Sequence, residues 1–276
     1  MEPETSSPRP PRPVILAATD FSETAEAALE WASELARLQG ARLELVHAVT
    51  VPPAMAGFVP PGPLFDEEVR AAALARLGEA AGRLRKMGAE VSTHLAMGIP
   101  SAAIVDRAEE LSAATIVMGT RGLTGLRHLL LGSTTERVMH RAPCPVLSVH
   151  PGDRGRHRPI RSILVPTDFS RDAELAIEAA HRLLAPLEKD ARLILLHAFN
   201  LPIEYTAYGP IPLSLNYLKD AGLEAERQLE ELRERLQREG LELETVAKEG
   251  DPAAVITEEA ERLEVDLIAM GTHGGS

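Results

Sequence analysis

Short apolar runs alternate along the chain with longer stretches in which apolar residues recur every three or four positions. The run at 14–18 is apolar throughout, as in a parallel strand that is covered on both faces. Ser22 is a suitable N-cap for the helix that follows, and Gly40 a suitable end. Between them, one helical face collects Ala25, Ala28, Leu29, Ala32, Leu35 and Ala36. This alternation predicts a parallel sheet with helices on both faces.

The same alternation continues to residue 149. Further strands are predicted over 43–49, 90–96, 115–118 and 145–149, and helices over 66–87, from Pro100, and from Ser133 to about Arg141. Pro100 suits the first position of its helix. The helix over 66–87 should end at Gly88, and the side chains expected to face inward are those of Leu74, Leu77, Ala81 and Leu84.

The second half of the chain repeats the first. The segment ILAATDFS at 15–22 returns as ILVPTDFS at 163–170, and LVHAV at 45–49 returns as LLHAF at 195–199. Residues 98–122 align with 250–274 without a gap, and 12 of those 25 positions are identical. Such matched order indicates duplication of a whole domain. The fold class expected is therefore α/β, with two tandem copies of an open five-stranded parallel-sheet, doubly wound domain of the nucleotide-binding kind.

The repeat also sets the expected domain boundaries. Residues 1–13 are rich in proline and should form a disordered tail, followed by domain 1 at 14–150, a linker at 151–161 and domain 2 at 162–276. In domain 2, Asp251 should cap a helix that has Pro252 at its start, and a fourth strand is expected over 266–270. Because the sequence stops at Ser276, domain 2 is expected to be C-terminally incomplete and to lack its last helix and strand. Its fourth strand would then be covered by domain 1, by another chain or by a segment beyond the given sequence.

Composition excludes several classes of function. The chain has 29 Lys and Arg against 41 Asp and Glu, a net charge of −12, which disfavours nucleic acid and membrane surfaces as partners. Nine aromatic residues are too few for a base-stacking platform. A single cysteine, Cys144, excludes an internal disulfide framework. No apolar run approaches the ~20 residues that span a bilayer, and the N-terminus has no signal-peptide core, so a cytoplasmic protein is expected.

Candidate chemistry gathers where ligands bind in open parallel sheets, beyond the carboxyl ends of the strands at the switch point. Thr19 and Asp20 follow the first strand, and His47 and Ala48 end the second. After the fourth strand comes a glycine loop: Gly119, two residues, Gly122, nine residues, and then Gly132 and Ser133 at the start of a helix. Glycines admit phosphate oxygens close to backbone amides, and a helix start favours an anion. The spacing fits neither a Walker loop nor the dinucleotide fingerprint. A lone Gly-x-x-Gly would more often be a tight turn.

The TDFS segment, the HA pair after the second strand, and MGTRG followed nine residues later by GST resemble the universal stress protein family, in its ATP-binding branch. The resemblance covers nearly all of both repeats and implies a tandem member of that family. It implies a nucleotide site in domain 1 made of Ala18, Thr19, Asp20, Ala48, Met118, Gly119, Arg121, Gly122, Gly132, Ser133 and Thr134. A partial site in domain 2 would use Pro166, Thr167, Asp168, Ala198, Met270, Gly271 and Gly274. Ala18 departs from the proline that the family commonly has there.

Each candidate also has a purely structural interpretation. Asp20 and Asp168 could order their strand-to-helix turns. A backbone hydrogen bond is favoured over catalysis for His47 and His197. Solvated loop charges account equally well for Arg121 and Arg127. A small buried hydrophobe is expected of Cys144, and an ion-paired outer face of the helix over 223–239, whose inward side chains should be Leu229, Leu232 and Leu236.

The function favoured is an ATP-binding stress-response regulatory protein. The ligand would be ATP or a related adenine nucleotide, with Mg²⁺ or Mn²⁺ held by its phosphates, and no residue is assigned to catalysis or directly to a metal. Slow ATP hydrolysis and a non-nucleotide interaction module of the same fold are the alternatives. The resemblance further implies pseudo-symmetric pairing of the two domains, a homo-oligomer and a protein partner whose identity the sequence does not supply.

Overall fold

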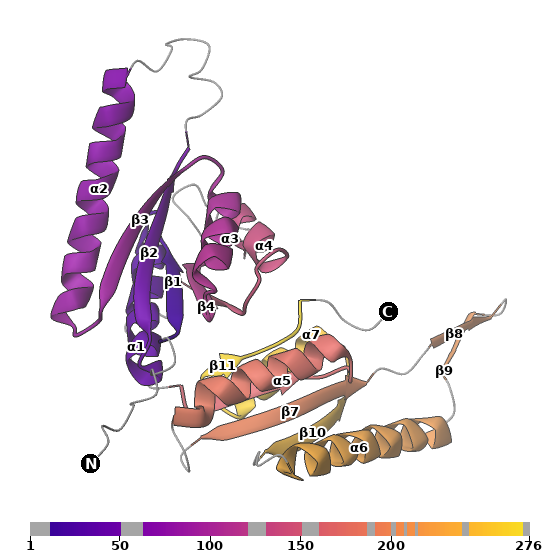
Figure 1. The fold of residues 1–276 in the computed structure, drawn as a ribbon. Coiled ribbons are helices and arrows are strands. Elements are labelled where there is room, and N and C mark those ends of the chain that lie inside the picture. Colours follow the sequence, from indigo (N-terminus) through magenta and orange to yellow (C-terminus); the bar gives the residue numbers. More distant parts are fainter. Residues whose placement is uncertain are drawn as a thin grey trace, which may run out of the picture. The chain divides into compact units, whose positions relative to one another are not determined.

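The computed structural model describes residues 12–50, 63–120, 131–150, 160–186, 191–199, 203–206, 209–212, 215–238 and 243–272. The chain forms two compact units, unit 1 (Met1–His157) and unit 2 (Arg158–Ser276). Strands and helices alternate in each, as Figure 1 shows. The expected α/β fold with tandem parallel sheets is confirmed.

Unit 1 is an open sheet covered on both faces. Its elements are β1 (Val14–Ala18), α1 (Glu23–Gln39), β2 (Arg42–Val49), α2 (Pro63–Lys86), β3 (Val91–Met97), α3 (Pro100–Leu111), β4 (Thr115–Gly119), α4 (Ser133–Met139) and β5 (Val146–Val149). The five strands are parallel in the order β3-β2-β1-β4-β5. Helices α1 and α2 pack on one face of the sheet, and α3 and α4 on the other. The order reverses between β1 and β4, which places the switch point there.

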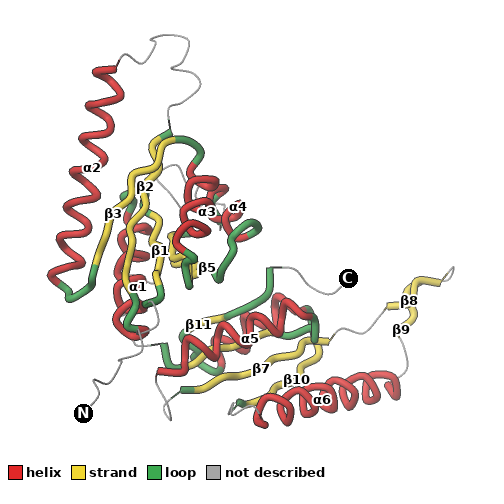
Figure 2. The backbone as a smooth tube through the Cα atoms, viewed as in Figure 1, coloured by secondary structure: helices red, strands yellow, loops and turns green. Residues whose placement is uncertain are grey.

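Unit 2 follows the same path. Its elements are β6 (Ser162–Pro166), α5 (Arg171–Leu184), β7 (Arg192–Phe199), β8 (Ile203–Thr206), β9 (Gly209–Pro212), α6 (Leu215–Arg238), β10 (Glu244–Glu249), α7 (Pro252–Arg262) and β11 (Leu267–Ile268). Within the described residues the parallel strands run β10-β7-β6-β11. The antiparallel pair β8–β9 joins β7 to α6 and was not expected from the sequence; Figure 2 shows it as a small hairpin.

The helix ends follow from local capping. The hydroxyl of Ser22 accepts a hydrogen bond from the Ala25 amide (3.2 Å), and Ser170 caps α5 in the same way. Gly40 ends α1 in the left-handed conformation at φ +59°. In unit 2 the carboxylate of Asp251 accepts from the Ala254 amide (3.1 Å). The predicted caps at Ser22, Gly40 and Asp251 are confirmed, because each depends only on residues within three or four positions, and Ser170 repeats the cap of Ser22 in unit 2.

The core of unit 1 lies on both sides of β1. All five residues of this strand are buried, in parallel register with β2 on one side and β4 on the other. One core cluster joins Leu16 and Ile116 in the sheet to Ile104 and Ala108 of α3 and Val138 of α4. The predicted inner face of α1 is buried throughout.

Two expectations need correction. Leu74 was expected to face inward but is 45% exposed, whereas Leu77 is 1% exposed. The buried stripe of α2 consists of Ala73, Leu77, Ala80, Ala81 and Leu84, and Leu74 falls at its border. The fourth strand of unit 2, expected over 266–270, is only β11, two residues long. The helix expected over 223–239 begins eight residues earlier, as α6 (Leu215–Arg238), and α4 ends at Met139 instead of near Arg141; other boundaries shift by one to three residues.

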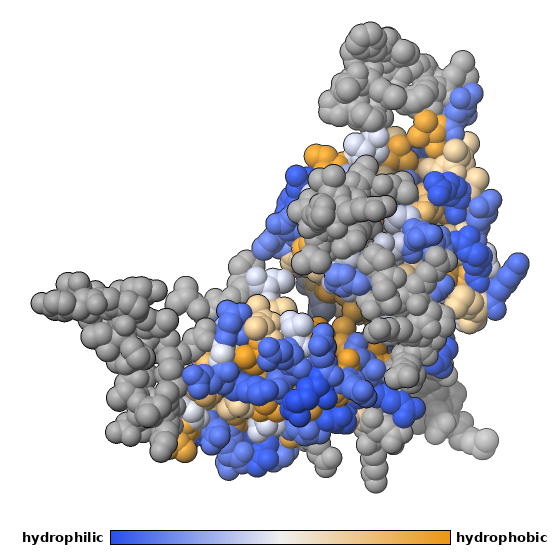
Figure 3. Space-filling view, turned by 180° about the vertical axis from the view of Figure 1, so that it is seen from behind, coloured by the Kyte–Doolittle hydropathy of each residue, from blue (hydrophilic) through white to orange (hydrophobic). Residues whose placement is uncertain are grey.

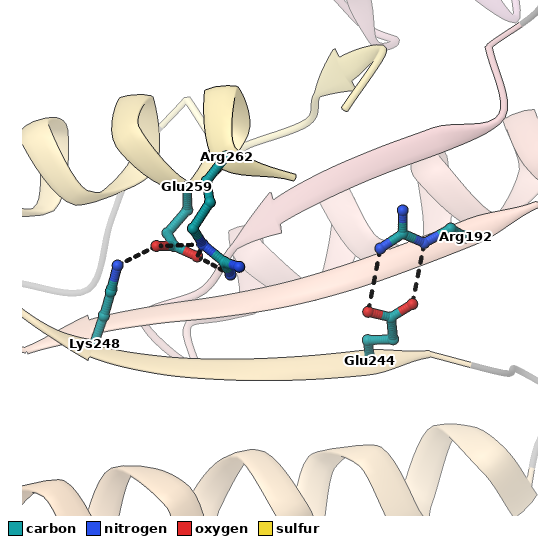
Figure 4. Close-up of polar contacts among 5 residues, drawn as sticks. All are labelled: Arg192, Glu244, Lys248, Glu259 and Arg262. Carbon is teal, nitrogen blue, oxygen red and sulfur yellow. Dashed lines mark hydrogen bonds and ion pairs between the residues drawn. The ribbon is translucent and has the colours of Figure 1, made fainter. Parts of the chain in front are cut away.

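Ion pairs connect α3 and α7 to their sheets. In unit 1 the guanidinium of Arg107 on α3 contacts Glu44 of β2 (2.6 Å). In unit 2 the fully buried Glu259 on α7 binds both Lys248 of β10 and Arg262, as Figure 4 shows. A second, exposed ion pair lies at the start of the neighbouring strands β7 and β10, where Arg192 contacts Glu244. On the side of unit 2 drawn in Figure 3, hydrophilic residues cover most of the described surface.

Candidate functional site

The first part of the site is the turn from β1 into α1. Three side chains in succession accept backbone hydrogen bonds: Thr19 Oγ1 from the Phe21 amide (3.0 Å), Asp20 Oδ1 from the Ser22 amide (3.0 Å), and Ser22 Oγ from the Ala25 amide. Phe21 has φ +63°, a left-handed conformation that is uncommon for a bulky residue. Asp20 therefore orders the turn, as its structural interpretation requires, and is held at the carboxyl edge of β1.

The second part is the end of β2. The Thr19 amide donates to the Val46 carbonyl (3.0 Å), and His47 Nδ1 lies 2.7 Å from the Thr19 carbonyl oxygen. The ring of His47 also packs against that of Phe21, with centroids 4.4 Å apart. The expected backbone hydrogen bond of His47 is thus confirmed. Ala48, the next residue of β2, lies beside this turn and pairs in register with Ala96 of β3.

The third part is the base of the glycine loop after β4. The Gly132 amide donates to the Thr120 carbonyl (2.6 Å), and the Thr135 hydroxyl donates to the Gly119 carbonyl (2.8 Å). The Thr120 amide in turn donates to the Val149 carbonyl of β5 (2.9 Å). These bonds bring the two ends of the loop together at the carboxyl end of β4, so the start of α4 lies beside that strand.

Gly119 packs against the first turn of α1. A Cβ added there would lie 2.8 Å from the Thr24 methyl carbon and 3.1 Å from its backbone carbonyl group. Such a contact would require β4 or α1 to shift, so glycine is needed for close packing at this point. Gly119 thereby links the glycine loop to the helix that begins at the Asp20 turn.

The structure brings most of the predicted residues of unit 1 to the carboxyl ends of three adjacent strands. Ala18, Thr19 and Asp20 end β1, Ala48 lies near the end of β2, and those at the end of β4 and the start of α4 are Met118, Gly119, Gly132, Ser133 and Thr134. Arg121 and Gly122 lie outside the described residues, as does Arg127. The described site is thus at the switch point, where an open α/β sheet binds ligands.

Unit 2 repeats the first two parts closely. The amides of Phe169 and Ser170 donate to Thr167 Oγ1 and Asp168 Oδ1 (both 3.0 Å), and Phe169 has φ +62°. His197 Nδ1 lies 2.8 Å from the Thr167 carbonyl oxygen. Pro166 ends β6 ahead of this turn, and Ala198 follows His197 in β7. The predicted residues of the partial site around β6 and β7 therefore lie together.

The units differ beyond their fourth strands. Met118 is 5% exposed between β1 and β5, whereas Met270, its equivalent, is 58% exposed after the short β11. Gly271 follows Met270 and is half-buried, and Gly274 lies outside the described residues. The described part of unit 2 thus reproduces the β6 and β7 side of the site and not the covered β4 side.

Two further groups bear on the chemistry. Burial raises the pKa of the Cys144 thiol to about 11, and the half-buried side chain packs against the core cluster of unit 1. This cysteine is therefore a neutral packing residue, although it is less buried than the sequence suggested. Within the described residues, no cluster of three or more His, Cys, Asp or Glu side chains is arranged to hold a metal ion.

Two features of the site were not singled out from the sequence. One is the left-handed conformation of Phe21 and Phe169, whose only sequence signal is that TDFS occurs in both repeats. The other is Arg76 of α2, whose guanidinium carbon lies 4.2 Å from the centre of the Phe21 ring. That contact joins positions 55 residues apart and has no local pattern.

The fold and the position of the site define a doubly wound α/β protein with a ligand site at the carboxyl edge of its parallel sheet. The sequence profile of the universal stress protein family matches residues 12–150 and 159–276. The chain belongs to the universal stress protein family and contains two of its domains. In keeping with that fold, none of the described helices is both long and apolar enough to cross a membrane.

Individual relatives agree with this assignment. Universal stress protein YxiE of Bacillus subtilis is 34% identical over a 143-residue alignment that covers 49% of this chain and 97% of that protein. A universal stress protein of Mycolicibacterium smegmatis is 28% identical over 272 residues, 94% of this chain and 87% of the relative. The crystal structure of a universal stress protein from Archaeoglobus fulgidus matches with a TM-score of 0.72 at 22% identity, covering 93% of this chain and 86% of that one, which shows a shared fold.

Proposed function

We propose that unit 1 binds ATP, or a related adenine nucleotide, at the carboxyl edge of β1, β2 and β4, and that the protein is a nucleotide-dependent regulator in the stress response. The observation that carries the proposal is the closed base of the glycine loop. Hydrogen bonds from Gly132 to Thr120 and from Thr135 to Gly119 hold its two ends at the switch point.

Each part of the site has a role in this proposal. The adenosine part would lie against the ends of β1 and β2, with Asp20 on one side and the backbone of Ala48 on the other. Met118 and Gly119 would line the path from ribose to phosphates. The phosphates would contact the glycine loop, including Arg121 and Gly122, together with the hydroxyls of Ser133 and Thr134. Because glycines leave backbone amides open to phosphate oxygens, the loop suits an anion despite the acidic composition of the chain.

The packing of the loop supports a built site over an ordinary turn. Gly119 has no room for a side chain beside Thr24, and Thr120 and Thr135 are both almost fully buried. A surface turn would need neither the close approach nor the buried hydroxyls. Mg²⁺ or Mn²⁺ would accompany the phosphates of the nucleotide, and the cytoplasm is the proposed location.

The direct test is to denature freshly purified protein and to identify any released nucleotide by chromatography and mass spectrometry. Titration calorimetry with ATP then compares the wild type with Gly132→Val, which we expect to abolish binding because a branched side chain obstructs the loop. Gly82→Val is the matched control, since a Cβ at Gly82 on α2 meets nothing within 4 Å. Absence of released nucleotide and of ATP binding by the wild type would contradict the proposal and favour a non-nucleotide interaction module. Unchanged binding by Gly132→Val would refute the site.

A further inference from the structure

The turn that carries Asp20 is held from outside by two side chains, those of His47 and Arg76. His47 of β2 contacts the Thr19 carbonyl through Nδ1 (2.7 Å), and its ring lies against Phe21. Arg76 of α2 also packs on Phe21, at 4.2 Å from the ring centre. These contacts come from two elements far along the chain, so the turn is not defined by its own four residues alone.

The hydrogen bond of His47 determines which ring nitrogen carries a proton. A peptide carbonyl oxygen only accepts, so Nδ1 must donate. The Thr19 amide is at the same time bound to the Val46 carbonyl (3.0 Å). Both polar groups of the Thr19 peptide backbone are therefore bound to β2, which fixes the orientation of the chain where it leaves β1.

The backbone conformation of Phe21 explains why these contacts to the turn are needed. A phenylalanine at φ +63° is in a region that L-residues with a side chain seldom occupy, and it persists only where the surroundings enforce it. In this conformation the Ser22 amide reaches Asp20 Oδ1 (3.0 Å). The hydrogen bond from His47 to the Thr19 carbonyl keeps the turn from relaxing to a commoner backbone conformation, which would move Asp20, and the tilted ring contact with Phe21 adds to this support.

Unit 2 has the same arrangement. Phe169 has φ +62°, its ring centre lies 4.6 Å from that of His197, and His197 Nδ1 lies 2.8 Å from the Thr167 carbonyl oxygen. Two copies that differ at many other positions thus keep the histidine, the phenylalanine and the unfavourable φ together. This repetition indicates that the histidine, the phenylalanine and the left-handed backbone conformation together stabilise the turn.

We infer that His47 is a positioning residue of the nucleotide site, which donates Nδ1–H to the Thr19 carbonyl and supports Phe21 so that Asp20 faces the ligand in a fixed place. The inference rests on the proposed function for its effect on binding. His47 itself does not contact the nucleotide. His47 acts through the turn. The position of its N–H donor relative to the backbone therefore matters more than its aromatic ring.

Replacement of His47 by Asn or by Gln distinguishes the effect of the hydrogen-bond donor from the effect of side-chain size. Asn places its Nδ2 donor at the same distance from the backbone as histidine Nδ1, whereas Gln places its donor one bond further. We expect His47→Asn to bind ATP within about threefold of the wild type, and His47→Leu and His47→Gln about tenfold more weakly, the cost of about one hydrogen bond and its support. His94→Leu, on the neighbouring strand β3, is the control and should bind normally. Equal binding by all variants, or equal loss in Asn, Gln and Leu, would overturn the inference.

A second measurement needs no nucleotide and so distinguishes failure of this inference from failure of the proposed function. Long-range ¹H–¹⁵N spectra, assigned by loss of the signals in His47→Asn, should show a protonated Nδ1 on His47. Loss of the imidazole ring shifts nearby signals in all three variants, so the test is the additional displacement: the amide signals of Phe21 and Ser22 should move further in His47→Leu and His47→Gln than in His47→Asn. An unprotonated Nδ1, or amide signals that respond alike in all three variants, would overturn the inference even if ATP binds. If the wild type binds no ATP while these spectra come out as expected, only the proposed function fails.

Discussion

Arg107 and Glu259 occupy equivalent positions in the two repeats, 152 residues apart, and carry opposite charges. On α3, Arg107 contacts Glu44 of β2 and Glu110 of its own helix (2.7 Å). On α7, Glu259 contacts Lys248 of β10 and Arg262, which is the equivalent of Glu110. Each helix is thus ion-paired to its sheet through the same repeat position, but the helix supplies the positive charge in unit 1 and the negative charge in unit 2.

Another ion pair kept its polarity. Glu26 of α1 contacts Arg83 of α2 (2.6 Å), and the equivalent residues Glu174 and Arg235 connect α5 to α6 (2.5 Å). These pairs are partly exposed, whereas Glu44 and Glu259 are buried. A buried charge requires a partner of opposite sign, and either residue can supply it. Complementarity, and not residue identity, is therefore what the fold retains at the helix-to-sheet contact.

Removing the cation in unit 1 should be costly. Arg107→Met would leave the buried Glu44 carboxylate with the Ser92 hydroxyl (3.1 Å) as its remaining partner among the contacts described. We expect a loss of about 3 kcal/mol in the free energy of unfolding of unit 1, because an uncompensated buried charge remains. Arg192→Met is the control and should cost under about 1 kcal/mol, since the Arg192–Glu244 pair is exposed. Denaturant titration followed by circular dichroism measures both, and similar losses would contradict the argument.

Glu259 should make the stability of unit 2 depend on pH. Hydrogen bonds from Arg262, and then from Lys248, outweigh the effect of burial and lower the pKa of this carboxyl from 4.5 to about 2. Because the folded state holds the proton less tightly than the unfolded state, the stabilisation is complete above about pH 4.5 and is lost as the pH falls towards about 2. Glu259→Gln should be less stable than the wild type at neutral pH, and the difference should shrink across that window. A difference that is constant with pH would contradict the prediction.

Gly119 should not tolerate a side chain. In Gly119→Ala the new Cβ would lie 2.8 Å from the Thr24 methyl carbon, and we expect a loss of about 2 kcal/mol in stability together with weaker ATP binding. Gly82→Ala on α2 meets open space and should instead gain up to about 1 kcal/mol from higher helix propensity. Thermal melting and calorimetry compare the two variants. A neutral Gly119→Ala would show that β4 and α1 can separate freely.

The buried face of α2 can be tested with two neighbouring leucines. Leu77→Ala should lower the free energy of unfolding by about 3 kcal/mol, because the deleted side chain leaves a cavity in the core. Leu74→Ala should cost less than about 1 kcal/mol, because that side chain is close to half exposed. Chemical denaturation of both variants gives the comparison. Equal losses would mean that α2 packs through the face first predicted from its periodicity.

ATP hydrolysis should be slow. Asp20 already accepts the Ser22 amide in its turn, and the described part of the glycine loop offers amides and hydroxyls, which bind phosphate without abstracting a proton. Steady-state turnover with Mg²⁺ or Mn²⁺ should therefore lie far below the enzyme median of about 10 s⁻¹. A rate near that median would favour an ATP-hydrolysing enzyme over a regulator.

Local sequence determined much of this protein. The all-apolar run of β1 and the serine caps at Ser22 and Ser170 act over a few residues, so pattern and capping predict these elements. The repeat predicted two units of one topology, and the site residues around Asp20 and Asp168 could be placed because the carboxyl ends of parallel strands share one edge. A backbone hydrogen bond of His47 was favoured over catalysis because the sequence places no carboxylate or second histidine at ligand spacing nearby, and the structure confirms that bond.

Only the tertiary structure decided the contacts between distant positions. The periodicity of apolar positions placed Leu74 and Leu77 on the same inner face of α2, whereas the structure leaves Leu74 exposed and Leu77 buried. The inverted polarity of Arg107 and Glu259 is visible in the sequence, but its meaning depends on Glu44 and Lys248 lying beneath them. The contacts of the left-handed Phe21 with His47 and Arg76 likewise join positions 26 and 55 residues apart. Packing energy between such partners is set by their separation in space, on which spacing along the chain carries no information.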